Sequence, residues 1–392
     1  MQGLEKIQQA LGAEGIDAWL LYDFRVSNPV FWQVLQTQKK TTRRLFLLIP
    51  AQSEPELLVH AIEREAWEGS PVGLVDYSGR AHMQEWLRQA LQDRRRVAME
   101  YSPDGALPTL SWVDGGTLDL VRSYGVEVVS SAGVFQQALT TWSPTALESH
   151  LEAARHVGQI KDLAFDFIRD NLAAGQTVDE CDVQDSILQA FAERGLETDH
   201  GPIVGVEAHS GDPHYEPRRP GAAQVRPGAW VLIDLWARRP GDAHIFGDIT
   251  WVAHAGRQPS PQQRQVFDTV RRARDRVVDQ LQRCWRVGQA LEGWELDDIA
   301  RQCIEEAGYG SHFTHRTGHS LGPGPAVHGL GVNLDNLETR DTRQILPGTG
   351  FTIEPGIYLP HFGVRLEINI YVDPTRGPLV TTPVQDEIIS LV

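Results

Sequence analysis

The sequence predicts an α/β protein of two domains, and three observations support this. A chain of 392 residues is longer than one hydrophobic core usually organises. Residues 1–142 alternate short helical and extended patterns, which is typical of a small α/β domain with a mixed sheet. Residues 143–392 contain pairs of longer helical patterns separated by strand-like runs, which favours an α+β domain. We therefore place the domain boundary between residues 142 and 143.

The elements of the first domain follow from changes in hydrophobic periodicity. Helical spacing over residues 3–13 ends at Gly15, and the apolar run IDAWLLYDF (16–24) then predicts a buried strand. Further strands are predicted over residues 44–50, 56–62, 95–101 and 126–131, with a helix over residues 83–91. We find no cluster of chemically active side chains in this domain.

The second domain begins at a helix-start signal, Ser143 followed by Pro144. Helical periodicity extends from there to residue 172, and a second helix ends before Gly195. Two more helices are predicted over residues 261–281 and 294–308. Strand-like runs follow each pair of helices, so the order helix–helix–strands occurs twice and resembles a duplicated unit.

Composition argues against several classes of partner. The 36 basic and 52 acidic residues give a net charge of −16, whereas nucleic acid and anionic membranes require clustered Lys and Arg. Three cysteines are too few for a disulfide framework or a cysteine zinc site. The N-terminus lacks a signal-peptide pattern, and no apolar run approaches ~18 residues. We therefore expect a soluble, cytoplasmic protein.

Two acids lie within apolar strand patterns that a turn-rich segment joins. Asp234 lies in AWVLIDLWA (229–237) and Asp248 in HIFGDITWVA (244–253). A buried acid is costly unless it is paired or bound to a cation, so two acids on neighbouring strands predict a cation-filled pocket. The alternative is that one or both face solvent, since the second face of a strand can be polar.

The segment HFTHRTGHSLGPGPAVHG (312–329) contains four of the chain's 14 histidines, His312, His315, His319 and His328. Its glycines argue against a helix and permit the close backbone approach that a metal site or ligand needs. A single histidine is most often structural, whereas four clustered among glycines favour a functional site.

Two glutamates lie in apolar strand patterns near the C-terminus. Glu354 comes directly before Pro355, and Glu367 lies inside GVRLEINIYV (363–372). Arg365 precedes Glu367 by two residues and therefore shares its face of the strand. Arg365 could pair with Glu367, or it could point past it and bind a substrate carboxylate.

Two aspartates, two glutamates and at least one histidine form a ligand set rich in hard oxygen donors. Such a set suits Mn²⁺, Co²⁺ or Zn²⁺ in a dinuclear site and does not suit a structural zinc. Two ions ~3.5 Å apart can hold a bridging hydroxide and polarise a carbonyl, so the residues predict a hydrolase. A match to the serine-hydrolase motif, Gly318-His319-Ser320-Leu321-Gly322, is rejected because Pro323 and Pro325 prevent the helix that the motif needs.

These residues resemble the pita-bread (M24-type) metallopeptidases, which include methionine aminopeptidase, aminopeptidase P, prolidase and creatinase. The family's ligand order matches Asp234, Asp248, His319, Glu354 and Glu367. The resemblance runs from residue 145 to the C-terminus, and residues 1–142 resemble a creatinase-type N-terminal domain. It implies a pita-bread catalytic domain with two divalent ions per subunit, manganese being expected and cobalt or zinc the alternatives.

Three features resemble the proline-specific branch of this family: the extra N-terminal domain, Arg365 in Val-Arg-Leu-Glu, and the intact ligand set. They imply an Xaa-Pro dipeptidase (prolidase) that uses a metal-bridging hydroxide, forms a homodimer and takes peptides with proline in second position. The alternatives are an aminopeptidase P that acts on longer peptides and a non-catalytic peptide-binding protein.

The resemblance also implies residue roles. Asp234 would chelate one ion, Asp248 and Glu367 would bridge both, and His319 and Glu354 would each bind one. Glu354 would also relay a proton from the attacking water. On the substrate side, the resemblance implies roles for His214, His315, His328, Tyr358 and Arg365.

Among these substrate-side residues, His328 would steady the scissile carbonyl and His315 would shuttle protons or contact the substrate carboxylate. Arg365 would hold the C-terminal side of the substrate, with His214 and Tyr358 nearby. Two departures from the family pattern stand out: inserted turns at residues 238–242 and 323–325.

Overall fold

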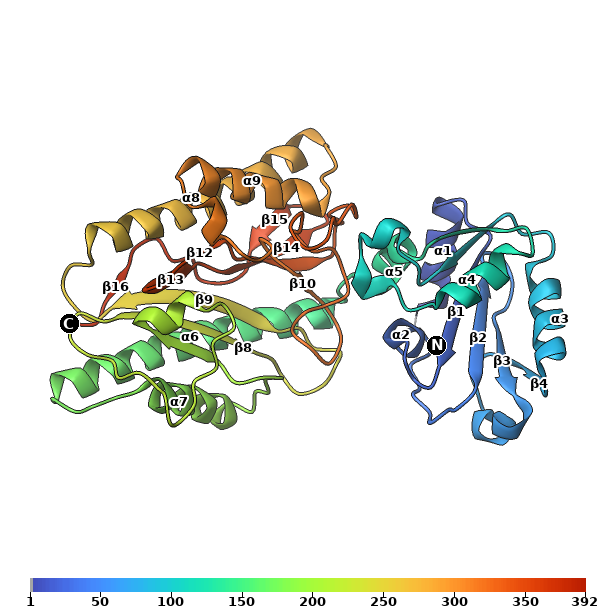
Figure 1. Cartoon of the computed structure of the whole chain (residues 1–392), viewed down its shortest axis with the longest axis horizontal. Helices are drawn as coiled ribbons and strands as arrows, with labels where there is room; N and C mark the ends of the chain where they lie inside the picture. Colours follow the sequence, from blue (N-terminus) through green and yellow to red (C-terminus); the bar gives the residue numbers. More distant parts are fainter. Residues whose placement is uncertain (1–2) are drawn as a thin grey trace. The chain divides into compact units, whose positions relative to one another are not determined.

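The computed structural model describes residues 3–392, and the chain divides into two compact units, Met1–Thr140 and Thr141–Val392. Each unit contains its own sheets and helices (Figure 1). The predicted two-domain architecture is confirmed, and the predicted boundary lies two residues beyond the division at residue 140.

The N-terminal domain is built on a six-stranded sheet in the order β4-β3-β2-β1-β5-β6. β1 pairs antiparallel with β2 and parallel with β5, so the predicted mixed sheet is confirmed. The strands are β1 (Ala18–Phe24), β2 (Arg44–Pro50), β3 (Glu56–His60), β4 (Gly73–Tyr77), β5 (Arg96–Met99) and β6 (Glu127–Ser130). β4 was not predicted, because its five residues are only partly buried and lack a clear alternation.

The helices of this domain are α1 (Leu4–Ala13), α2 (Pro29–Leu35), α3 (Arg80–Leu91), α4 (Gly115–Arg122) and α5 (Ala132–Leu139). Sequence reasoning found α1 and α3 and missed the other three, each of which is eight residues or shorter. α2 nevertheless carries a local start signal, since the Asn28 side chain accepts hydrogen bonds from the amides of Val30 and Phe31.

The C-terminal domain contains the four predicted helices, α6 (Pro144–Ala173), α7 (Glu180–Glu193), α8 (Pro261–Val287) and α9 (Gly293–Glu306). α6 begins where expected, because Ser143 Oγ accepts a hydrogen bond from Ala146 N and Pro144 occupies the first turn. A capping box at Ser260 begins α8 in the same way. Local sequence chemistry therefore sets both helix starts.

Between these helix pairs lie the strands that position the site (Figure 1). One sheet has the order β16-β9-β8-β7, a second has β10-β11-β14-β15, and β12 pairs with β13. Their bounds are β7 (Ile203–Val206), β8 (Trp230–Ala237), β9 (Gly247–His254), β10 (Ser320–Leu321), β11 (Gly350–Ile353), β12 (Gly356–Leu359), β13 (Phe362–Arg365), β14 (Ile368–Asp373), β15 (Gly377–Val380) and β16 (Ile389–Ser390). The predicted order helix–helix–strands, repeated once, is confirmed.

Each pair of helices buries apolar side chains against its own strands. One core joins α6 and α7 to β7, β8 and β9, and a second joins α8 and α9 to β11 through β14. None of the helices in residues 3–392 combines the length and apolar composition needed to span a bilayer.

Candidate active site

The β8–β9 hairpin places its two acids on the same face. Asp234 lies opposite Thr250, and Asp248 lies opposite Trp236, two residues further along β8. Because side chains alternate between faces, Asp234 and Asp248 are diagonal neighbours on one face. Both are buried, with 7% and 3% of their surface exposed, so the alternative that they face solvent is wrong.

Glu354 and His319 approach these acids from the second sheet. Glu354 directly follows β11 and its amide donates to Thr317 O at 2.7 Å. His319 directly precedes β10, and its amide donates to Thr352 Oγ1 at 2.9 Å. The same Thr352 hydroxyl donates to Glu354 Oε1 at 3.1 Å. One threonine therefore fixes the backbone of one predicted ligand and the side chain of the other.

Glu367 lies between β13 and β14, and Thr250 holds it in place. The Glu367 amide donates to Thr250 O at 3.2 Å, and Thr250 Oγ1 donates to Glu367 Oε2 at 2.8 Å. Thr250 was missed by sequence reasoning. Its position two residues after Asp248 was the available signal, because that spacing puts both side chains on the same face of β9.

The side chains of the predicted metal ligands converge. His319 Nε2 lies 3.4 Å from Asp248 Oδ2 and 3.6 Å from Glu354 Oε1. Asp248, His319 and Glu367 each offer a ligand atom, and these atoms all lie within 4.8 Å of one another. Asp234 is close enough for its charge to raise the pKa of Asp248.

Burial and like charges shape the protonation of this cluster. Burial raises the pKa of Asp248 and of Glu367 well above their ordinary values, and neighbouring carboxylates raise both further. Burial also raises the pKa of Glu354, to about 7. In contrast, burial lowers the pKa of His319 well below its ordinary value, which favours the neutral imidazole that binds metals. The carboxylates therefore need protons or cations to neutralise them.

The cluster fits divalent metal ions. Asp234 Oδ1 is buried and has no hydrogen-bond partner among the described residues, although Oδ2 of the same carboxylate pairs with Arg365. An unpaired buried carboxylate oxygen is costly, and a cation would satisfy it. Several carboxylates with one neutral imidazole form a donor set suited to Mn²⁺, Co²⁺ or Zn²⁺.

Arg365 is fully engaged with protein groups. Its Nη2 pairs with Asp234 Oδ2, its Nε donates to Thr250 Oγ1 at 3.0 Å, and its Nη1 donates to Tyr358 OH at 3.1 Å and Pro213 O at 3.2 Å. Its ion pair is thus with Asp234, and the expectation that it could pair with Glu367 is wrong. The approach of β13 to β8 and β9 decides this partner, which local spacing does not reveal.

Tyr358 continues the chain of hydrogen bonds to His315. The Tyr358 hydroxyl lies 2.7 Å from His315 Nε2, and His315 Nδ1 lies 2.7 Å from Arg316 O. Because a carbonyl only accepts, Nδ1 carries the proton and Nε2 accepts from Tyr358. Burial lowers the pKa of His315 to about 3, which agrees with a neutral ring.

The other histidines singled out from the sequence lie in different environments. His328 is exposed on its loop, with its ring centroid 4.1 Å from that of His319. His214 is also exposed. Burial raises the pKa of Asp234, and His214 is among the groups that oppose this rise, which places it within electrostatic reach of the cluster. His312 instead contacts the Tyr358 carbonyl, at 3.2 Å.

The two inserted turns contact each other. Gly324 N donates to Asp242 O at 2.8 Å, and the buried Arg238 guanidinium donates to Gly324 O. Val327, next to His328, donates its amide to Asp199 Oδ2 at 3.0 Å. The turns therefore brace the loop that carries His328, a contact that sequence reasoning missed.

Ser320, the serine of the rejected hydrolase motif, is buried and hydrogen-bonded to the backbone. Ser320 is 3% exposed, and its hydroxyl accepts from Gly331 N at 3.1 Å. No helix follows it anywhere in residues 321–392. A nucleophile elbow requires an exposed serine with a helix directly after it.

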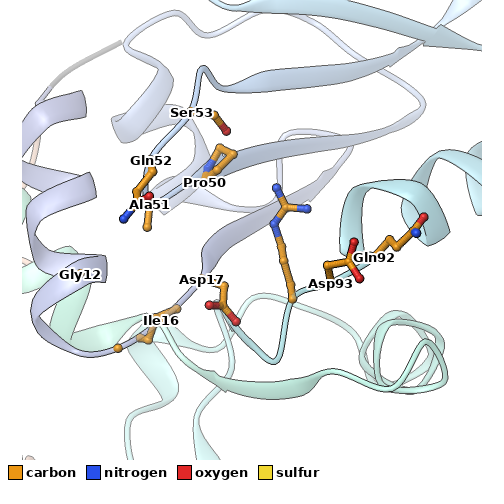
Figure 2. Close-up of a pocket in the computed structure, with 11 residues that line it drawn as sticks. Gly12, Ile16, Asp17, Pro50, Ala51, Gln52, Ser53, Gln92 and Asp93 are labelled. Atoms are coloured by element: carbon orange, nitrogen blue, oxygen red, sulfur yellow. The ribbon is translucent and has the colours of Figure 1, made fainter.

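A pocket of about 570 Å³ in the N-terminal domain offers no comparable cluster (Figure 2). It lies where β1 begins and β2 ends. Its Asp17 carboxylate already accepts hydrogen bonds from the amides of Arg95 and Arg96, at 2.6 and 2.9 Å. The cluster of candidate ligands therefore lies in the C-terminal domain.

Comparison with known proteins agrees with this geometry. Residues 152–374, more than half of the chain, match metallopeptidase family M24. The Xaa-Pro dipeptidase of Lactobacillus delbrueckii subsp. lactis is 27% identical over 380 residues, which cover 93% of this chain and 92% of the relative. A dipeptidase from Mycobacterium ulcerans has a similar fold, with a TM-score of 0.69, 22% identity and coverage of 99% and 96%. The prolidase from Pyrococcus horikoshii OT3 also has a similar fold, with a TM-score of 0.62, 23% identity and coverage of 99% of both chains.

Proposed function

This chain belongs to metallopeptidase family M24, and we propose that it hydrolyses the Xaa-Pro bond of dipeptides with two divalent metal ions, manganese being expected. The observation that supports this proposal most is the convergence of Asp248, His319 and Glu367 beside the unpaired oxygen of Asp234. The 27% identical Xaa-Pro dipeptidase supports the substrate class.

The residues that would hold the ions are Asp234, Asp248, His319, Glu354 and Glu367. When bound, two such ions lower the pKa of water and polarise the scissile carbonyl. Glu354 suits proton transfer, because Thr352 occupies only Oε1 and leaves Oε2 without a side-chain donor among the described residues. Oε2 would accept the proton of the attacking water and pass it to the leaving proline nitrogen.

Arg365 and Tyr358 would order the substrate side of the site. Arg365 holds Asp234 and Tyr358, so we propose that it orients these two groups. That it also holds the C-terminal side of the substrate stays a prediction. The Arg316 carbonyl and the Tyr358 hydroxyl together keep His315 in one tautomer and orientation, while the exposed His214 and His328 would contact the substrate directly.

The first experiment compares proline release from Ala-Pro with cleavage of Ala-Pro-Gly and of Ala-Ala, before and after chelation and Mn²⁺ restoration. Metal-dependent cleavage of Ala-Pro alone is the expected result. Cleavage of the tripeptide as well would identify an aminopeptidase P, the second candidate. Failure to cleave either proline peptide with a full metal site would contradict the proposed substrate class.

A homodimer is also part of the proposal. Family resemblance is its only support, and the mass of the protein in solution tests it. A monomeric mass with full activity would contradict it.

A further inference from the structure

Glu180, in the first turn of α7, has a fully buried carboxylate outside the metal cluster. Its oxygens accept four short hydrogen bonds. Oε1 accepts from Val206 N at 2.7 Å and faces His209 Nδ1 at 2.9 Å, while Oε2 accepts from Tyr215 OH at 2.6 Å and Ala223 N at 2.7 Å. A buried polar network whose members are all paired is rigid, so this carboxylate holds its donors in place.

All four donors belong to one segment, residues 206–223. Val206 ends β7 and begins the segment, and Ala223 closes it. The two side-chain donors come from its interior, where the rings of His209 and Tyr215 stack with centroids 4.4 Å apart. One carboxylate therefore ties both ends and the middle of this segment, here called the Glu180 loop.

The Glu180 loop also contacts Arg365 and strand β13. Pro213 O accepts a hydrogen bond from Arg365 Nη1 at 3.2 Å. Ser210 Oγ accepts from Gly363 N at 2.9 Å. The fit to β13 is tight, since a Cβ on Gly363 would lie only 2.0 Å from Ser210 O. A shift of the loop would therefore disturb the hydrogen bond between Pro213 O and Arg365.

His214 lies between the two ends of this connection. It directly follows Pro213, whose carbonyl contacts Arg365, and directly precedes Tyr215, whose hydroxyl contacts Glu180. Its own amide donates to Asp212 Oδ1 at 3.0 Å within the loop. Hence the place of the His214 side chain depends on contacts made by both of its neighbours.

We propose that Glu180 is a positioning residue for substrate binding, which holds the Glu180 loop so that His214 and Pro213 O keep their places beside the metal cluster. This inference rests on the proposed function. Glu180 touches neither the predicted ligands nor the substrate-side residues, so it acts only through the loop. Sequence patterns gave no sign of it, because its donors lie 26 to 43 residues away.

The test is Glu180→Gln in the full-length, Mn²⁺-loaded protein. Glutamine keeps the shape but offers one acceptor oxygen, so part of the donor set loses its acceptor. We expect KM for Ala-Pro to rise about tenfold while kcat changes less than about threefold. Bound metal should stay unchanged. Glu193→Gln makes the same chemical change at an exposed position near the C-terminal end of the same helix, and it should match the wild type.

A double-mutant cycle separates positioning from general destabilisation. If Glu180 acts through the loop, Glu180→Gln adds little to the defect of His214→Ala. Fully multiplicative effects would overturn the inference. Tyr215→Phe removes only one of the four donors, so it is the variant to use if Glu180→Gln does not fold. It should raise KM in the same direction by a smaller factor.

Hydrogen exchange tests the inference independently of the substrate. Glu180→Gln should speed exchange in residues 206–223 and leave α9 unchanged, whereas unchanged exchange in residues 206–223 would overturn the positioning role. A wild-type protein that cleaves no Xaa-Pro peptide would contradict the proposed function alone. A cleaving wild type with an indistinguishable Glu180→Gln variant would contradict the positioning role alone.

Discussion

Asp248 is the carboxylate of the cluster with the least support from hydrogen-bond donors. Asp234, Glu354 and Glu367 each accept a hydrogen bond from a neighbouring side chain. Among the described residues, the side-chain contact of Asp248 is with His319, at 3.4 Å. A cation is therefore the strongest partner that the site can give this buried acid.

Asp248→Asn should abolish turnover, with a loss of at least about 10³-fold, and should lower bound metal, because an amide is a poor bridging ligand. The fold should persist, since the amide is isosteric with the acid. Activity assays, metal analysis and near-UV circular dichroism check this. Asp119→Asn, at an exposed position of α4, is the control. Normal turnover in Asp248→Asn would contradict the site assignment.

Glu100 gives a residue-scale prediction in the N-terminal domain. It is fully buried, and burial raises its pKa from 4.5 to about 7, although hydrogen bonds from Trp19 and Asn28 oppose the rise. The folded protein therefore binds more protons than the unfolded chain between these pH values. Protonated Glu100 therefore contributes fully to the free energy of unfolding below pH 4.5. This contribution, about 3 kcal/mol in total, is lost as pH rises through 7.

Hydrogen exchange of the β1 and β5 amides in urea, corrected for intrinsic rates, measures how the free energy of unfolding of this domain changes with pH. Glu100→Gln should weaken this dependence on pH, whereas Glu56→Gln, at an exposed position of β3, should leave it unchanged. An unchanged dependence on pH in Glu100→Gln would show that another group is responsible.

At the scale of elements, the short strand β10 and its partner β11 approach each other so closely that only glycine fits before His319. A Cβ on Gly318 would lie 2.0 Å from Thr352 O, while one on Gly322 would have Ser320 Oγ at 4.0 Å as its nearest neighbour. Thr352 holds both His319 and Glu354, so crowding at Gly318 would displace two predicted ligands together.

Gly318→Ala should therefore lower kcat/KM by about 10²-fold and destabilise the domain by about 1–3 kcal/mol. Gly322→Ala should behave like the wild type in both respects. Steady-state kinetics and thermal unfolding of the two variants make the comparison. Equal effects of the two substitutions would show that the close approach of β10 and β11 does not position the ligands.

At the scale of the whole molecule, the two domains have separate hydrophobic cores, and the acid cluster lies in only one of them. Metal binding should therefore stabilise the C-terminal domain selectively. A ligand at about 100 times its Kd adds about 2.7 kcal/mol to the free energy of unfolding of the domain that binds it.

Adding Mn²⁺ to chelated protein should accordingly slow exchange of the β8, β9 and β14 amides by up to about 100-fold. The β1 and β2 amides should not change. Equal protection in both domains, or none in either, would contradict a metal site confined to β8, β9, β10, β11 and β14.

Features that depend on residues close together in the chain could be predicted from the sequence alone. The start of α6 follows from Ser143 and Pro144, and the shared face of Asp234 and Asp248 follows from strand alternation across one hairpin. The order of acids and histidine was sufficient to identify the M24 family. Strand β10 escaped prediction because its two residues carry no periodicity.

Contacts between side chains that are distant in the chain could not be predicted in this way, because they depend on how the strands of the domain pack. Arg365 pairs with Asp234, 131 residues away, rather than with Glu367 beside it, and Glu180 takes its donors from residues 26 to 43 positions further along the chain. The physical reason is that hydrogen bonds and ion pairs depend on distances in space. Strand alternation specifies the face of a side chain, but the packing of β13 against β8 and β9 specifies its partner.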